Sequence, residues 1–114
     1  MNIKGIEIDF DFLDADNVEK FETEAKKVIE KTEKKEIVEL SYAEALRKEC
    51  EIVEDFIDNV FGKGISEQIF KGKHNLGEHI QVFQLIVDEK NKKQEELEKI
   101  MSRYLPRKEE RRRK

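Results

Sequence analysis

A glycine-rich run with interleaved lysines spans residues 61–77, FGKGISEQIFKGKHNLG, and holds four of the chain's five glycines. This composition suggests a phosphate-binding loop, in which backbone N–H groups surround the phosphate and a lysine contacts it. The Walker motif requires Gly, four residues, and then Gly-Lys-Ser/Thr. Here Gly62 and Lys63 are followed by Gly64, and the residue five positions before Gly62 is Ile57. The spacing therefore does not fit a nucleoside-triphosphate loop.

The dinucleotide-binding fingerprint fails as well. It needs a third glycine at residue 67, which is Glu67, and it must follow a strand, whereas this run follows a predicted helix. Glycine is favoured just past the end of a helix, where the backbone takes a left-handed conformation. We therefore expect three glycines of the run to form structural turns: Gly62, Gly64 and Gly72.

Metal and catalytic sites are not expected either. His74 and His79 are five residues apart, about 140° around a helix, so one helical face cannot present both to a metal. A calcium loop starting at Asp9 would need an oxygen ligand and then Gly where Leu13 and Asp14 stand. No His-Ser or His-Cys pattern is visible. We predict no catalytic residue, no cofactor site and no metal site, and hence no enzyme.

Charge is distributed unevenly along the chain. Because the whole chain carries −4 and residues 106–114, PRKEERRRK, carry +4, residues 1–105 carry −8. The acidic body should repel nucleic acid. The alternative to a protein-binding function is a nucleic-acid-associated protein that uses the basic residues of this tail, although the tail has no aromatic residue for base stacking. These residues are Arg107, Lys108, Arg111, Arg112, Arg113 and Lys114.

Cellular location follows from two further features of the sequence. No apolar run approaches the roughly 18 residues of a membrane span, and no signal peptide precedes the charged residues. Cys50 is the only cysteine, which excludes an internal disulfide and suits a reducing compartment. We expect a cytoplasmic protein with no membrane partner.

The residue pattern predicts a mainly α-helical domain over residues 1–105, followed by a disordered basic tail over 106–114. Alternating apolar and acidic residues predict a strand over 3–12, and residues 34–40 are either a loop or a short strand. Asp16 with Glu19, and Ser41 with Glu44, resemble capping boxes, and Asn75 is expected to cap the last helix with Glu78 at its third position. The predicted bundle has three main helices and one short helical turn, at about 16–34, 41–61, 66–70 and 75–104.

The last helix has an interrupted apolar stripe. The stripe covers its first turns, stops over the wholly polar residues 88–96, and resumes in register at Leu97, Ile100, Met101 and Tyr104. This pattern predicts a helix that extends beyond its domain and ends in a partner-binding patch, whereas folding back onto the first helix is the alternative. Within the chain only residues 34–40 could pair with the N-terminal strand. We therefore expect another chain, a second copy or a partner, to complete the strand or the patch.

The central run resembles a family of small proteins from phages and prophages of Gram-positive bacteria, the tail assembly chaperones. In that family an acidic-aromatic helix ends in Phe-Gly and is followed by the residues matched here in DFIDNVFGKGISEQIFKGKHNL, residues 55–76. Lys71 departs from the pattern, since the family often has a second Gly there. The matching positions are Phe61, Gly62, Gly64, Ser66, Ile69, Phe70, Gly72, Lys73, Asn75 and Leu76.

The two ends of the chain, DFDFLDADNVEKFE and YLPRKEERRRK, are also similar to the ends of that family. The resemblance implies a small, mostly helical, non-enzymatic protein in the bacterial host cell. It further implies that the protein binds the tape-measure protein and helps tail-tube subunits polymerise around it.

Overall fold

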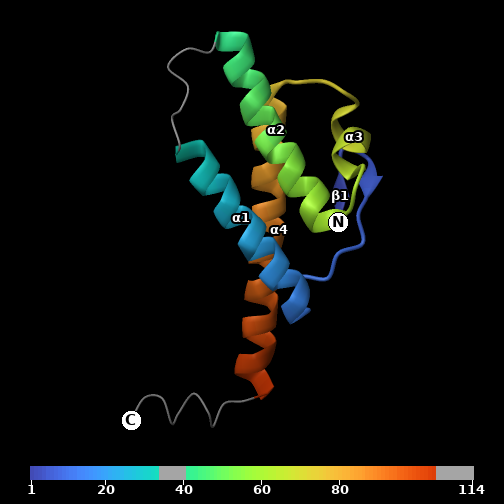
Figure 1. Ribbon diagram of the computed structural model, residues 1–114. Coiled ribbons are helices and arrows are strands. Elements are labelled where there is room, and N and C mark those ends of the chain that lie inside the picture. The colour runs from blue at the N-terminus through green and yellow to red at the C-terminus, as the bar shows by residue number, and fades with distance from the viewer. Residues whose placement is uncertain (34–40, 105–114) are drawn as a thin grey trace.

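The computed structural model describes residues 1–33 and 41–104, which form a short hairpin and four helices (Figure 1). Most of the described chain is helical, as the sequence predicts. The predicted element at 34–40 and the predicted tail at 106–114 lie outside the described residues. The elements are β1 (Asn2–Ile3), β2 (Ile6–Glu7), α1 (Ala15–Glu33), α2 (Tyr42–Phe61), α3 (Ile65–Phe70) and α4 (Leu76–Tyr104).

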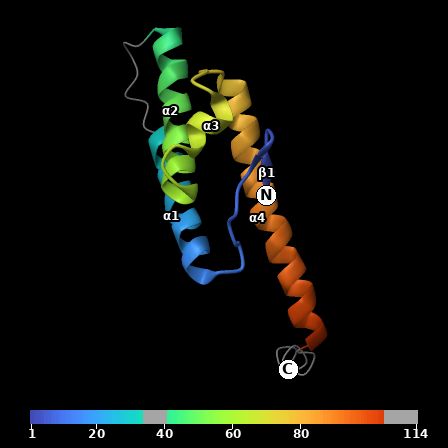
Figure 2. The ribbon, with the colours of Figure 1, turned by 90° about the vertical axis from the view of Figure 1, so that its right-hand side faces the viewer.

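Helix α2 is the centre of the bundle. It packs against α1 on one side, against α4 on another and against the short α3 near its C-terminal end. Ile52 and Val53, adjacent in sequence, are both buried, because neighbouring helices cover more than one face of α2. Figure 2 shows α3 beside the C-terminal end of α2 and the first turns of α4.

Aromatic rings connect the elements of the core. Phe12, in the segment before α1, meets Phe21 of α1 edge-on at a centroid distance of 5.5 Å. Phe21 meets Phe56 of α2 at 5.6 Å, and Phe56 meets Phe83 of α4 at 5.0 Å. Edge-to-face pairs of this kind are worth about 0.5–1.5 kcal/mol each beyond the area they bury. The chain of rings therefore fixes the N-terminal segment, α1, α2 and α4 relative to one another.

The N-terminal segment corrects one prediction. Instead of one strand over residues 3–12, β1 and β2 form an antiparallel hairpin in which Ile3 pairs with Ile6. Lys4 and Gly5 make its turn with φ values of +50° and +85°, and Asn2 Oδ1 accepts a hydrogen bond from Gly5 N at 3.0 Å. Two positive φ values in succession suit a two-residue hairpin. The segment thus pairs with itself, so the expectation that only residues 34–40 could pair with it was wrong.

After the hairpin, buried and exposed residues still alternate as predicted, although these residues belong to no sheet. Ile8 and Phe12 are buried, whereas Asp9 and Asp11 are exposed. No strand is assigned over residues 8–14, and their apolar side chains pack on the helices instead of on a second strand. The alternation of apolar and acidic residues therefore predicted which side chains are buried. It did not predict that helices, and not a second strand, cover them.

Side chains cap three of the helices. Ser41 Oγ accepts from Glu44 N at 3.2 Å and Asn75 Oδ1 accepts from Glu78 N at 3.0 Å, both as predicted. The start of α1 differs, because Asp14 rather than Asp16 supplies the cap: its Oδ1 accepts from Asp16 N at 2.9 Å. Asp14 precedes the first helical residue and so can reach backbone N–H groups that have no partner within the helix.

Candidate partner-binding surface

The C-terminal end of α4 carries the four apolar residues that the sequence singled out. In Figures 1 and 2 this end of α4 continues past the other helices. Three of the side chains are exposed by 47%, 45% and 77%, namely Ile100, Met101 and Tyr104, and Leu97 is half-buried. We call these four residues the α4 patch.

The α4 patch continues the core face of its own helix. Each member follows a core-face residue by eighteen positions, which is five turns of 3.6 residues. In the first turns of α4 this face is covered, and His79, Val82 and Ile86 are buried there. Five turns later, most of the same face of α4 is exposed to solvent. The pairs are His79 with Leu97, Val82 with Ile100, Phe83 with Met101, and Ile86 with Tyr104.

The polar middle of α4 maintains the helix between the two apolar regions. Lys90 Nζ donates to Gln94 Oε1 at 2.7 Å, and Gln94 Nε2 donates to Glu98 Oε1 at 3.1 Å. Lys93 Nζ lies 3.6 Å from Glu96 Oε2. Pairs three or four residues apart stabilise a helix by about 0.2–0.5 kcal/mol each. These contacts support the helical conformation that presents the α4 patch.

The glycine-rich run forms the joint between α2, α3 and α4. Gly62, Gly64 and Gly72 have φ values of +132°, +91° and +77°, in the region that favours glycine. Lys71 also takes a positive φ of +54°. The run therefore makes turns at these positions.

A carboxylate of the chain itself occupies the start of α3. Asp58 Oδ1 accepts from Ser66 N at 2.9 Å, and Asp58 Oδ2 accepts from Ser66 Oγ at 2.9 Å. The sequence treated Ser66 as the first residue of this turn, whereas α3 begins at Ile65 and Ser66 is buried within it. Asp58 thus anchors α3 to α2. Its carboxylate already accepts the hydrogen bond of the Ser66 backbone N–H, a group that a phosphate bound at the start of α3 would need.

The sequence missed the most buried polar side chain of the described residues. His79 is 0% exposed, its Nδ1 lies 2.7 Å from the Asn75 carbonyl oxygen, and its Nε2 lies 2.7 Å from Glu54 Oε2. His74, by contrast, is exposed in the loop before α4. The two histidines are therefore in different environments. Position 79 is seven residues before Ile86, and this core periodicity was the signal that could have identified it.

Residues 1–33 and 41–104 show neither a metal-binding cluster nor a membrane-spanning helix. Within these ranges no three His, Cys, Asp or Glu side chains are grouped so as to hold a metal ion. None of the described helices combines the length and the apolar character that crossing a bilayer requires. The basic residues of the nucleic-acid alternative, from Arg107 to Lys114, lie outside the described part of the chain.

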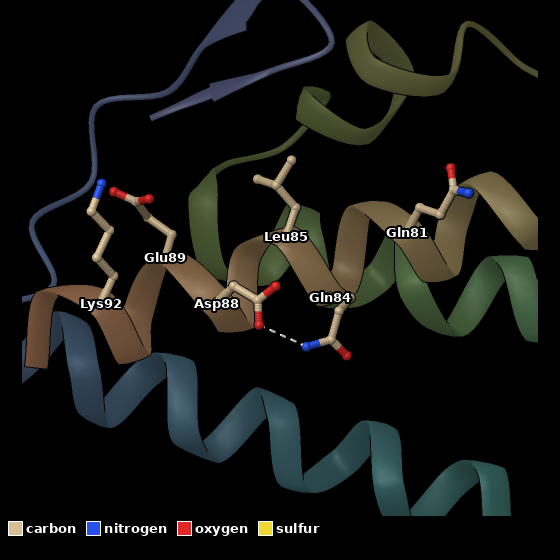
Figure 3. Close-up of a pocket in the computed structure, with 6 residues that line it drawn as sticks. All are labelled: Gln81, Gln84, Leu85, Asp88, Glu89 and Lys92. Carbon is tan, nitrogen blue, oxygen red and sulfur yellow. Dashed lines mark hydrogen bonds between the residues drawn. The ribbon is translucent and has the colours of Figure 1, made fainter. Parts of the chain in front are cut away.

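Hollows on the described surface include the following two. The first lies along the outer side of α4, and all six side chains that line it come from that one helix, with Gln84 Nε2 donating to Asp88 Oδ1 at 2.8 Å (Figure 3). Groups from a single helix do not converge on one point as those of a ligand site do. The six residues are Gln81, Gln84, Leu85, Asp88, Glu89 and Lys92.

The second hollow is an apolar cleft of about 200 Å³ between α1, α2 and α4. It is smaller than the roughly 300–1,000 Å³ typical of small-molecule pockets. Ile80 of α4 is 55% exposed at this cleft. The cleft is lined by Val28, Thr32, Glu49, Val53, Leu76, Ile80 and Phe83.

Comparison with known proteins gives a family but no function. No curated protein and no solved structure matches the chain. The model of a family of unknown function, DUF6673, matches residues 4–114. Since this match covers nearly the whole chain, the protein belongs to the DUF6673 family.

Proposed function

We propose that this protein is a non-enzymatic tail assembly chaperone of a phage or prophage, acting in the cytoplasm of the bacterial host. It would bind tape-measure and tail-tube proteins through the α4 patch. The observation that carries this proposal is the exposed apolar end of α4. The same face of the helix is buried in the core in its first turns. The resemblance of residues 55–76 to tail assembly chaperones supplies the class of partner.

The spacing of the α4 patch supports binding of a helix in a groove. Leu97, Ile100, Met101 and Tyr104 stand at positions i, i+3, i+4 and i+7, the pattern by which an amphipathic helix lays its apolar face into a hydrophobic groove. Tyr104 is the most exposed of the four, at 77%. Tyrosine is enriched among the residues that dominate binding energy at interfaces. The partner is therefore expected to offer an apolar groove.

The proposal is tested by capture of purified tail-tube and tape-measure proteins from the same phage on the immobilised protein. Leu97→Glu with Met101→Glu places two charges in the α4 patch and should abolish capture. A matched control, Gln81→Glu with Asn91→Glu, adds the same charge at exposed positions of α4 outside the patch and should leave capture intact. A salt titration of DNA binding examines the alternative function.

The folded state of the variants is measured alongside binding. Because the α4 patch has little cover, the double variant should keep the helix content and the melting temperature of the wild type. If the double variant unfolds instead, the patch belongs to the core and the proposed surface is wrong. Salt-sensitive DNA binding together with no capture of either tail protein would favour the nucleic-acid alternative.

A further inference from the structure

Helix α4 carries a line of positions that begins beside its buried face. From position 80 to position 104, these positions follow one another at alternating steps of three and four residues, the heptad spacing of a coiled-coil seam. The buried residues of α4 are His79, Val82 and Ile86, and none of them lies on this line. Every side chain on the line is exposed or half-buried. We call positions 80, 83, 87, 90, 94, 97, 101 and 104 the α4 seam.

The α4 seam has the same pattern when it is read from either end. Its first three and its last three positions are apolar, and the two middle positions hold Lys90 and Gln94. A pattern that is symmetrical about its middle matches a second copy of itself running in the opposite direction. Two antiparallel α4 helices can therefore bury their apolar positions against each other. These positions are Ile80, Phe83 and Val87 at one end, and Leu97, Met101 and Tyr104 of the α4 patch at the other.

One antiparallel register matches every position of the two seams. In this register Lys90 faces Gln94 of the second copy, whose amide oxygen can accept from the ammonium, as Gln94 does from Lys90 within the chain at 2.7 Å. A shift by one heptad in either direction sets Lys90 and Gln94 against apolar side chains, and a parallel pair sets Lys90 against its own copy. Polar positions of this kind specify the register of a coiled coil. The apolar facing pairs are Ile80 with Tyr104, Phe83 with Met101, and Val87 with Leu97.

The same register brings the α4 patch of the second copy to the apolar cleft between α1, α2 and α4. Ile80 and Phe83 line this cleft of about 200 Å³, and they face Tyr104 and Met101 of the second copy. Ile80 is 55% exposed there. An apolar cavity of about 150 Å³ holds a benzene ring, so the cleft has room for one large side chain. The seam and the cleft are separate observations, and both indicate the same occupant.

Polar groups at the cleft suit the hydroxyl of Tyr104. Thr32 and Glu49 line the cleft together with its apolar residues. Thr32 Oγ1 donates to the Ile29 carbonyl oxygen at 3.0 Å, so the oxygen of Thr32 can still accept a hydrogen bond. The half-buried carboxylate of Glu49 can accept one as well. A tyrosine hydroxyl that becomes buried usually finds such a partner.

We propose that two copies of this chain pair through their α4 seams in an antiparallel, two-fold arrangement, so that each α4 patch covers the apolar cleft of the other copy. A two-fold contact is self-complementary, and every facing pair therefore occurs twice. The dimer does not depend on which tail protein the chain binds, and so it goes beyond the proposed function. Because the dimer covers three residues of the α4 patch, a tail partner must displace the second copy. Dimerisation thus regulates access to the patch.

Sedimentation equilibrium of the full chain tests the dimer. Ile80→Glu puts a carboxylate against Tyr104 at both ends of the two-fold contact, and it should raise the dimer dissociation constant at least about tenfold. Gln81→Glu, at the adjacent exposed position off the seam, is the matched control and should leave the constant unchanged. A wild type that is monomeric at every concentration, or a dimer that Ile80→Glu leaves intact, would overturn the proposal.

Capture of tail proteins separates this proposal from the proposed function. Ile80 lies outside the α4 patch, so the monomeric Ile80→Glu variant should still capture the tail proteins. Loss of capture with an intact dimer would contradict only the function. Capture by a wild type that never dimerises would contradict only the dimer.

Spin-label distances test the register without any change in the seam. Lys92→Cys and Lys99→Cys, each in a Cys50→Ala chain, carry the label at exposed positions off the seam. The two-fold axis of the proposed register passes position 92, so both labels there lie at the same height along the helices. Labels at position 99 are offset along the axis by twice seven residues, about 21 Å at 1.5 Å per residue. A longer distance at 99 than at 92 is expected, and equal distances, or no distance between copies, would overturn the register.

Discussion

The imidazole of His79 lies parallel to the ring of Phe70, with centroids 3.6 Å apart and planes inclined by 5°. This contact joins α4 to α3, and the same imidazole reaches Glu54 of α2. His79→Ala removes the stack, leaves a cavity and strips Glu54 of its partner. Such losses in a core cost about 2–5 kcal/mol. Urea unfolding should show this decrease, whereas the exposed His74→Ala should change stability by less than about 0.5 kcal/mol. Equal effects of the two substitutions would contradict a structural role for His79.

Asp58 holds α3 onto α2 through both of its carboxylate oxygens. Asp58→Ala leaves the backbone N–H and the hydroxyl of the buried Ser66 without these acceptors. We expect a loss of about 1–3 kcal/mol in the free energy of unfolding. Asp55→Ala, at an exposed position of the same helix, is the control and should have little effect. Denaturant midpoints measure both, and similar midpoints for the two variants would show that the Asp58 contact contributes little.

Gly62 ends α2 with φ +132° and ψ +148°, a conformation open essentially to glycine alone. An added Cβ would meet only Ile65 Cγ1 at 3.8 Å, so the cost of Gly62→Ala is backbone strain and not collision. We expect destabilisation of about 1–3 kcal/mol. Lys63→Ala at the next, exposed position should be nearly neutral. Micromolar binding of ATP or GTP that Lys63→Ala abolishes would show instead that the run holds phosphate.

Cys50 is fully buried, and burial followed by the negative charge of Glu54 raises the pKa of its thiol. The native thiol should therefore react slowly with a thiol reagent at neutral pH and rapidly once urea unfolds the chain. Because the pKa of the native thiol is raised, the neutral thiol contributes fully to the stability of the fold below about pH 8.5, the ordinary pKa of a thiol. This contribution is lost as pH rises through the pKa of the native thiol. Cys50→Ala should flatten the stability curve above pH 8.5. Equal modification rates in the native and unfolded states would contradict the buried site.

The helices were predictable because local signals and periodicity agree in them. Ser41 and Asn75 cap their helices as their spacing from Glu44 and Glu78 indicates. The hairpin was missed because its turn uses Lys4 in a positive-φ conformation, which lysine rarely adopts and which composition does not reveal. The pairing of His79 with Glu54 joins residues 25 apart in sequence, and only tertiary structure brings them together.

The position of the α4 patch was predictable for a different reason. Its register with the core face depends only on helical geometry, since five turns separate each pair of residues. How much of that face is covered depends on where the other helices end, and periodicity does not contain this information. Ile29 of α1 illustrates the point, because it is apolar and follows the buried Val28 but is nevertheless 56% exposed.

Capture of the tail-tube and tape-measure proteins tests the central claim most directly, in one comparison of three proteins matched in melting temperature. The account predicts that the wild type and the control double variant, Gln81→Glu with Asn91→Glu, retain the tail proteins equally. It predicts that Leu97→Glu with Met101→Glu loses at least tenfold in affinity, about 1.4 kcal/mol. Equal retention by all three proteins, or retention by none, would contradict the claim that the α4 patch binds these partners.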